Sequence, residues 1–201
     1  SDGTGPTFER NALAAWIGSY GLRWVLGSSP SGNAYLKSDT SSAPAQGQAY
    51  TASVWVKGVG TAVGKLFYLG LAEIGGASGT GSTYSTPVAL TGEWQFFKVS
   101  RIVEKADRTG LRIIPRYYTG AVAGDEVYAD AAQIEAQACP TPYCDGSLGA
   151  GHAWTGTAHG SSSTRAVAAL AYAQPLPTTG PFSIAAWIIP AASAAEIAAS
   201  T

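Results

Sequence analysis

The chain has 201 residues and a formal net charge of −1, and only 12% of its residues are charged, against about 25% in a typical soluble domain. This near-neutral balance argues against a nucleic-acid partner, and no apolar run approaches the roughly 20 residues that span a bilayer, so no membrane insertion is expected. Met is absent, so we expect Ser1 to be an internal or processed start and the chain to be a piece of something longer.

Strand patterns recur along the chain, whereas helix signals are poor. In Tyr50–Lys57 the side chains alternate, which predicts an inner face of Tyr50, Ala52, Val54 and Val56 and an outer face of Thr51, Ser53, Trp55 and Lys57. Further strands are expected at Lys65–Ala72, Trp94–Val103, Leu111–Thr119 and Val127–Ile134. The regular spacing of strands and turn residues predicts an antiparallel sandwich.

Three features complicate this pattern. Arg101 interrupts the inner-face set of the strand at Trp94–Val103 and leaves its register open. Pro115, inside an apolar run, predicts an edge strand or a bulge because proline cannot donate a ladder hydrogen bond. The Gly-rich stretch Gly75–Ser85 is interpreted as a mobile loop at the rim.

The composition changes near the cysteine pair. Residues 139–165 are small, polar and Gly-rich, which predicts a connector, and residues 166–201 predict the start of a second β unit or an arm that packs on a neighbour. Cys139 and Cys144 lie five positions apart. A disulfide forms there if the intervening prolines bring the two Cα atoms within about 7 Å, and two unbridged thiols are the alternative.

Several short segments, taken in order, resemble one class of proteins. They are Phe8-Glu9 followed by Trp16, Ser31-Gly32 leading to Tyr35-Leu36-Lys37, Gly47–Lys57, Gly92-Glu93-Trp94 and Val127–Glu135. This order resembles the carbohydrate-binding modules of families four, nine and twenty-two. The resemblance implies an all-β, antiparallel jelly-roll β-sandwich of the galactose-binding-like kind over residues 1–138.

The same resemblance implies a structural calcium ion. In the resembled modules, an acid after the N-terminal Phe and an acid in the last strand hold Ca²⁺ together with backbone carbonyls, and here those acids are Glu9 and Asp130. Calcium takes six to eight oxygen ligands, so the two carboxylates need further donors. The alternative is that both are ordinary solvated or hydrogen-bonded acids.

The later motifs resemble a second kind of protein. Thr141-Pro142-Tyr143 with Asp145-Gly146-Ser147, then Trp154–His159 and Ser161–Arg165, look like phage minor tail and tail-fibre proteins, and Phe182–Pro190 looks like the first strand of a laminin-G or concanavalin-like domain. The resemblance implies a non-enzymatic, extracellular virion tail component. Its partners would be a host cell-surface glycan and other tail subunits, and it would form a homo-oligomer, often a trimer in fibres.

Two alternatives to this function stay open. The sandwich could serve as a structural, assembly or decoration protein of the virion, with its aromatic face buried against another subunit. It could also be the accessory carbohydrate-binding module of a secreted polysaccharide-degrading enzyme.

Aromatic side chains supply the candidate glycan contacts, because their faces stack on the apolar faces of pyranose rings. The first group is Trp55 with Ser53 and Lys57, the second is Tyr117 and Tyr118 with Arg116, and the third is Tyr84. The face that carries Trp55 could equally be a protein–protein surface. Trp16, Trp24 and Trp94 are expected in the core or as staples near strand starts.

No catalytic pattern frames the titratable residues. His152 and His159 lie in the polar connector without a nucleophile elbow or a zinc-binding helix. The acids Glu104, Asp107, Asp125 and Glu126 fall in turn-like stretches, and nothing in the sequence favours a glycosidase pair among them. We therefore expect no enzymatic activity.

Overall fold

The computed structural model describes residues 5–28, 38–40, 43–77, 79–158 and 161–166. The chain divides into two compact units, Ser1–Pro140 and Thr141–Thr201. The regular secondary structure of the described residues is β-strand, apart from two 3-10 turns, η1 and η2. The elements of the larger unit are β1 (Thr7–Asn11), η1 (Ala12–Ala14), β2 (Gly21–Val25), β3 (Ser38–Asp39), β4 (Ala49–Val59), η2 (Gly60–Ala62), β5 (Leu66–Ile74), β6 (Gly81–Tyr84), β7 (Val88–Ala89), β8 (Gln95–Ile102), β9 (Gly110–Tyr117) and β10 (Glu126–Glu135).

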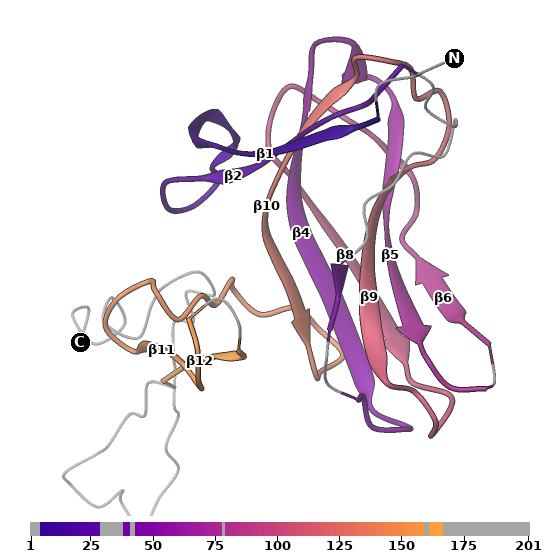
Figure 1. Ribbon diagram of the computed structural model, residues 1–201, viewed down its shortest axis with the longest axis vertical. Coiled ribbons are helices and arrows are strands. Elements are labelled where there is room, and N and C mark those ends of the chain that lie inside the picture. Colours follow the sequence, from indigo (N-terminus) through magenta and orange to yellow (C-terminus); the bar gives the residue numbers. More distant parts are fainter. Residues whose placement is uncertain (1–4, 29–37, 41–42, 78, 159–160, 167–201) are drawn as a thin grey trace, which may run out of the picture. The chain divides into compact units, whose positions relative to one another are not determined.

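The strands of the larger unit form two antiparallel sheets (Figure 1). Sheet A has the order β1-β2-β10-β4-β8, and sheet B has the order β3-β9-β5-β6 with β7 also paired to β5. Strands that are distant in sequence therefore lie side by side, as when β10 inserts between β2 and β4. This arrangement is a jelly-roll β-sandwich, which confirms the predicted fold class.

The core lies between the inner faces of the two sheets, as the alternation in β4 predicts. Ala52, Val54 and Val56 are buried against side chains of β5, which alternates in the same way: Phe67, Leu69 and Leu71. Burial of each large apolar side chain contributes about 1.5–3 kcal/mol relative to its exposure. The alternation of inward and outward side chains in β4 and β5 therefore determines which of their residues lie on the outer faces of the sheets.

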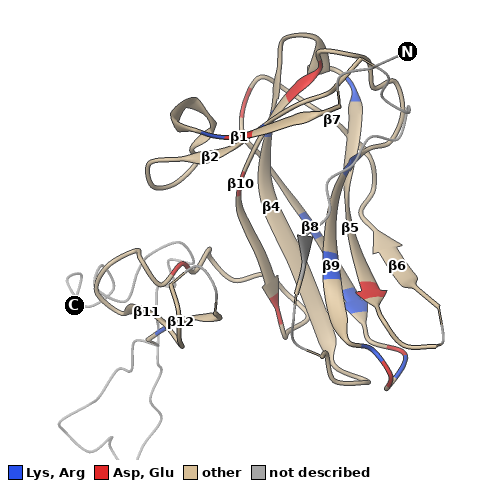
Figure 2. Ribbon diagram, in the orientation of Figure 1, with Lys and Arg blue, Asp and Glu red and all other residues tan. Residues whose placement is uncertain are grey.

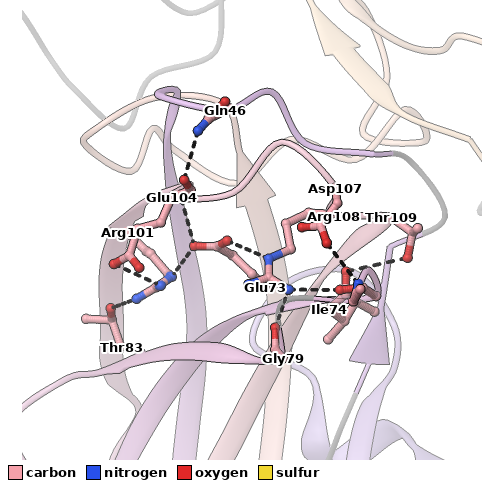
Figure 3. Close-up of polar contacts among 12 residues, drawn as sticks. Gln46, Glu73, Ile74, Gly79, Thr83, Arg101, Glu104, Asp107, Arg108 and Thr109 are labelled. Carbon is pink, nitrogen blue, oxygen red and sulfur yellow. Dashed lines mark hydrogen bonds and ion pairs between the residues drawn. The ribbon is translucent and has the colours of Figure 1, made fainter.

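Arg101 keeps the register of β8 and points inward with Phe97 and Val99 because a buried carboxylate receives it. The Oε1 atom of Glu73 accepts hydrogen bonds from Arg101 Nε at 2.7 Å and from the Glu104 N–H at 3.1 Å, and Oε2 accepts one from Arg108 Nε at 2.9 Å (Figure 3). Burial by itself raises the pKa of Glu73, but the hydrogen bonds outweigh it, and the pKa lies below its ordinary value.

Hydrogen bonds hold described residues of the Gly-rich loop after β5, and the mobility of this loop stays a prediction. The Nη1 atom of Arg108 donates hydrogen bonds to the carbonyl oxygens of Gly75 and Gly79, and Asp107 accepts one from the Ala77 N–H at 2.8 Å. Gly75 and Gly76 have φ near +79° and +75°, a conformation that glycine adopts without strain. The loop is thus tied to the Glu73 network and continues directly into β6.

Pro115 pairs with one strand among the described residues. Pro115 pairs with Leu69 of β5, whereas the described pairing of β9 with β3 involves only Ile113 and Arg112. The missing N–H of the proline therefore removes no ladder bond to a described strand on the β3 side, and the edge strand or bulge stays a prediction.

The smaller unit contains a hairpin of β11 (His152–Trp154) and β12 (Ser163–Arg165), so the predicted connector is ordered in part. The Asp145 carboxylate accepts the Ser147 N–H at 2.7 Å, and the Ser147 hydroxyl accepts the Trp154 indole N–H at 3.1 Å. The predicted second β unit lies outside the described residues, apart from Ala166.

Cys139 and Cys144 are free thiols in the structure, the second of the two alternatives that the sequence leaves open. Pro140 and Pro142 fix φ and disfavour helical backbone in the residues before them. No hydrogen-bonded turn folds the chain back between the cysteines.

Candidate functional site

Sheet B carries a cluster of tyrosines on its outer face. Tyr68 of β5 is buried, and the rings of Tyr84 and Tyr118 pack edge-on against it with centroids 5.1 and 5.7 Å away. Tyr84 keeps 43% of its surface exposed and Tyr118 keeps 49%. We call Tyr68, Tyr84, Tyr118 and the adjoining Arg116 the tyrosine cluster.

The tyrosine cluster joins two of the three groups that the sequence predicts as glycan contacts. Arg116 of β9 lies opposite Tyr68, with its guanidinium carbon 5.7 Å from the ring centroid. The Tyr84 ring lies over Gly70, since a Cβ atom there would stand 2.6 Å from the ring. The glycine therefore makes room for an aromatic ring that lies flat along the sheet.

Tyr68 was missed in the sequence, although a signal was present. In the segment from Lys65 to Ala72, Phe67 and Leu69 mark the inner parity, so Tyr68 must point outward, next to a glycine. Its burial, together with the neighbouring tyrosines, raises the pKa of its hydroxyl.

Tyr117, predicted as a glycan contact, belongs to the core, and that prediction is wrong. It follows the parity of Leu111 and Ile113, is fully buried, and packs edge-on against Phe67 and Trp24. Burial and the nearby charge of Asp125 raise the pKa of its hydroxyl. Adjacent strand residues point to opposite faces, so Tyr117 and Tyr118 cannot both face a ligand.

Sheet A carries a second aromatic cluster on its own outer face. Trp16, in the loop between β1 and β2, stacks on Trp55 of β4 with centroids 4.0 Å apart and planes at 19°. Phe96 lies 5.2 Å from Trp55, and Trp94 lies 6.0 Å from Trp16. Trp16 and Phe96 remain 43% and 41% exposed. We call Trp16, Trp55, Trp94 and Phe96 the tryptophan cluster.

The tryptophan cluster partly corrects the expectations for these residues. Trp55 points outward as predicted, but it is half-buried because Trp16 covers it. Trp16 and Trp94 are not core residues, whereas Trp24 is. Ser53 is buried and Lys57 is half-buried on the same outer face.

Asp130 holds the Trp16 loop in place. Its Oδ2 atom accepts the backbone N–H groups of Trp16 at 2.7 Å and Ile17 at 3.0 Å. Its Oδ1 atom accepts the N–H of Ala131, a residue with φ of 51° at the start of a bulge in β10. A non-glycine residue in this conformation costs roughly 1–2 kcal/mol, which the carboxylate helps to offset.

Glu9 and Asp130 do not fit a shared calcium site. Glu9 lies on β1 and Asp130 on β10, with β2 between the two strands. The Glu9 carboxylate accepts hydrogen bonds from Asn11 at 2.7 Å and from Arg23 at 3.2 Å, and both lower its pKa. The described residues contain no group of three or more His, Cys, Asp or Glu placed to hold a metal ion. Calcium binding stays a prediction without support from these two carboxylates.

The other acids named in the sequence have structural partners. Glu126 forms a two-point ion pair with Arg23, which lowers the pKa of Glu126. Asp125 is fully buried, and its carboxylate accepts hydrogen bonds from Thr61, Lys65 and a backbone N–H. Glu104 and Asp107 belong to the Glu73 network and its loop. His152 lies in β11, and His159 lies outside the described residues.

Comparison with solved structures identifies the fold. A CBM22-1 xylan-binding domain from Paenibacillus barcinonensis matches 68% of this chain and 87% of its own, at 14% identity and a TM-score of 0.51. The CBM22-1–GH10 modules of a Clostridium thermocellum xylanase, complexed with xylohexaose, match 67% of this chain and 25% of theirs, at 18% identity and a TM-score of 0.50. The larger unit has the jelly-roll fold of carbohydrate-binding modules.

A bacteriophage CBA120 tailspike domain matches 66% of this chain at 10% identity, but its TM-score of 0.46 is too low to support an argument. No protein-family model and no curated protein sequence matches the chain. Among the described residues, no helix is long and apolar enough to cross a membrane.

Proposed function

We propose that the larger unit is a non-catalytic glycan-binding module whose ligand lies on the tyrosine cluster of sheet B. The observation that supports this most is the convergence of Tyr84 and Tyr118, which come from separate strands and both keep nearly half of their surface open around Tyr68. The fold shared with xylan-binding domains agrees with this role without defining the sugar.

The chemistry of the tyrosine cluster suits a sugar. Tyrosine offers a ring face for the C–H groups of a pyranose and a hydroxyl for its polar edge. Arg116 adds a planar set of N–H donors beside the rings. Both exposed rings lean on a buried third ring, so they lose little conformational freedom when a ligand binds.

A glycan array and affinity measurements with the whole chain test this proposal. Tyr84→Ala and Tyr118→Ala each remove one ring on which the sugar would stack. We expect each variant to lose about tenfold in affinity, equivalent to about 1.4 kcal/mol. Tyr20→Ala is the matched control, since Tyr20 is 48% exposed but packs on Arg10 and belongs to neither cluster. Unchanged binding in both variants, or no binding to any glycan, would refute the proposal.

The biological setting rests on the connector motifs alone. Because Thr141–Ser147 and Trp154–Arg165 resemble phage tail proteins, we propose that the module acts outside the cell on a host-surface glycan, as part of a virion tail. Many weak sites on one particle would then bind by avidity. An accessory module of a secreted polysaccharide-degrading enzyme is the second candidate, favoured by the shared fold with xylanase-linked modules. Adsorption of virions that carry Tyr84→Ala distinguishes the two.

A further inference from the structure

The tryptophan cluster is bordered by positive charge on both sides along sheet A. Asp130, Trp55 and Phe96 form one cross-strand row, in which each residue pairs with the next. Lys57 lies two residues beyond Trp55 on one side, and Lys98 lies two residues beyond Phe96 on the other. Two steps along a strand span about 7 Å, so the backbone of each lysine lies about 7 Å along the sheet from the row of rings.

The outer face of sheet A also carries Glu9 and Glu126, and both of these acids are paired with Arg23. Neither Lys57 nor Lys98 forms an ion pair with a described residue. The Asp130 carboxylate accepts two backbone N–H groups of the Trp16 loop and the N–H of Ala131 in its own strand. Glu135, farther down the same face, binds Gln137 at 2.7 Å. Glu93 lies in the turn before β8, beyond the aromatic row. A ligand with a negative group would complement the two amino groups.

The rings themselves are arranged to receive one flat apolar face. Trp16 covers one face of Trp55, and its own outer face is left open next to the tilted Trp94. Asp130 fixes the backbone of Trp16 and Ile17, so the indole is already placed. An indole face matches the C–H face of one pyranose ring.

A backbone segment borders the outer face of sheet A on one side of the tryptophan cluster. Below the rings, the backbone of residues 137 and 138 crosses the sheet and accepts hydrogen bonds from Thr51 and Ser100. This segment closes the open face of sheet A on that side.

We propose that the tryptophan cluster, with Lys57 and Lys98, is a second binding site, and that its ligand is an acidic pyranoside such as a uronic-acid residue of a polysaccharide. The sugar ring stacks on Trp16, and its carboxylate binds a lysine. The site lies on the opposite sheet from the tyrosine cluster and shares no residue with it. It does not depend on the glycan site proposed there.

Tryptophan emission and calorimetry with the whole chain test the site. The probes are oligomers of polygalacturonate, polymannuronate and hyaluronan, each compared with its carboxyl-reduced form. We expect a saturable change in emission with at least one acidic probe and a loss of about tenfold or more in affinity for the reduced form. Binding should weaken as salt is added, because an exposed charge contact is screened.

Two kinds of variant separate this site from the other one. Lys57→Gln with Lys98→Gln keeps the aromatic stack and should lower affinity for the acidic probe about tenfold, and Trp16→Ala should abolish the emission change. Tyr84→Ala with Tyr118→Ala should leave both unchanged. Equal binding in the lysine variant, or no response to any acidic probe, overturns the proposal. Conversion of an oligomer into a monomer by Trp16→Ala would show instead that the cluster is a protein interface.

Discussion

Replacement of Glu73 by Gln should strongly destabilise the larger unit. The Glu73 carboxylate is fully buried and balances Arg101 and Arg108, whose side chains are almost as buried (Figure 3). Breaking a buried ion pair from one side costs about 3–5 kcal/mol, because the remaining charges lose their partner. For a unit of this size each kcal/mol lowers Tm by roughly 3–4 °C, so Tm should fall by roughly 10–20 °C.

Glu104→Gln is the matched control for this prediction. Glu104 pairs with the same Arg101 at 3.2 Å, but its side chain is 64% exposed, so its ion pair should contribute less than about 1 kcal/mol. Urea unfolding followed by tryptophan emission, together with calorimetry, measures both variants. An equal effect of the two substitutions would refute the reasoning from burial.

The pH dependence supplies a second check on Glu73. Its pKa is lower in the folded chain than the ordinary value of 4.5, so its stabilising effect is complete above pH 4.5. That effect is lost as the pH falls through the lower folded value. The difference in stability between the parent chain and Glu73→Gln should therefore be largest near neutral pH and shrink below pH 4.5.

Three further changes test other parts of the structure. Gly70→Ala would place a Cβ atom 2.6 Å from the ring above it, so the ring must move by about 1 Å and glycan affinity should fall about tenfold, whereas Gly92→Ala, with open space around it, should bind normally. Asp130→Ala should lower the free energy of unfolding by about 1–3 kcal/mol and shift tryptophan emission to the red. Addition of Ca²⁺ or a chelator should leave the Tm of the parent chain unchanged. Glu126→Gln should flatten the loss of stability below pH 4.5, because Arg23 lowers the pKa of Glu126.

The strands of the core could be predicted because their signal is local. The alternation of Ala52, Val54 and Val56 is visible within one segment, and it places Trp55 outward without further information. The prediction of Tyr117 as a glycan contact is wrong because it ignores the alternation of inward and outward residues in β9. Leu111 and Ile113 set the parity of β9, which assigns Tyr117 to the core and leaves Tyr118 for the surface.

The candidate sites could be predicted only in part, because they depend on contacts between distant segments. Trp55 was identified as outward-facing, but the ring that covers it comes from a loop about forty residues earlier and is held there by Asp130, more than a hundred residues later. Figure 2 shows that charged residues are sparse along the strands. A single charged residue at an inward position, such as Arg101, therefore suggests from sequence alone that the register of the strand is shifted. Its partner Glu73 lies on the other sheet, where no periodic pattern in β8 can reveal it.

The placement of the two aromatic clusters has a consequence for how the module would act. They lie on the outer faces of opposite sheets, with the whole core between them, so one ligand cannot cover both. A monomeric chain with both sites filled would join two polysaccharide chains. When the protein is added to a mixture of polygalacturonate and a neutral polysaccharide that binds the tyrosine cluster, light scattering should therefore rise. Scattering should then pass through a maximum and fall at excess protein, because separate protein molecules then occupy the binding positions on each polysaccharide and few chains are joined. Loss of the maximum in both Trp16→Ala and Tyr84→Ala would show that the two faces act together, whereas loss in only one variant would assign all binding to a single face.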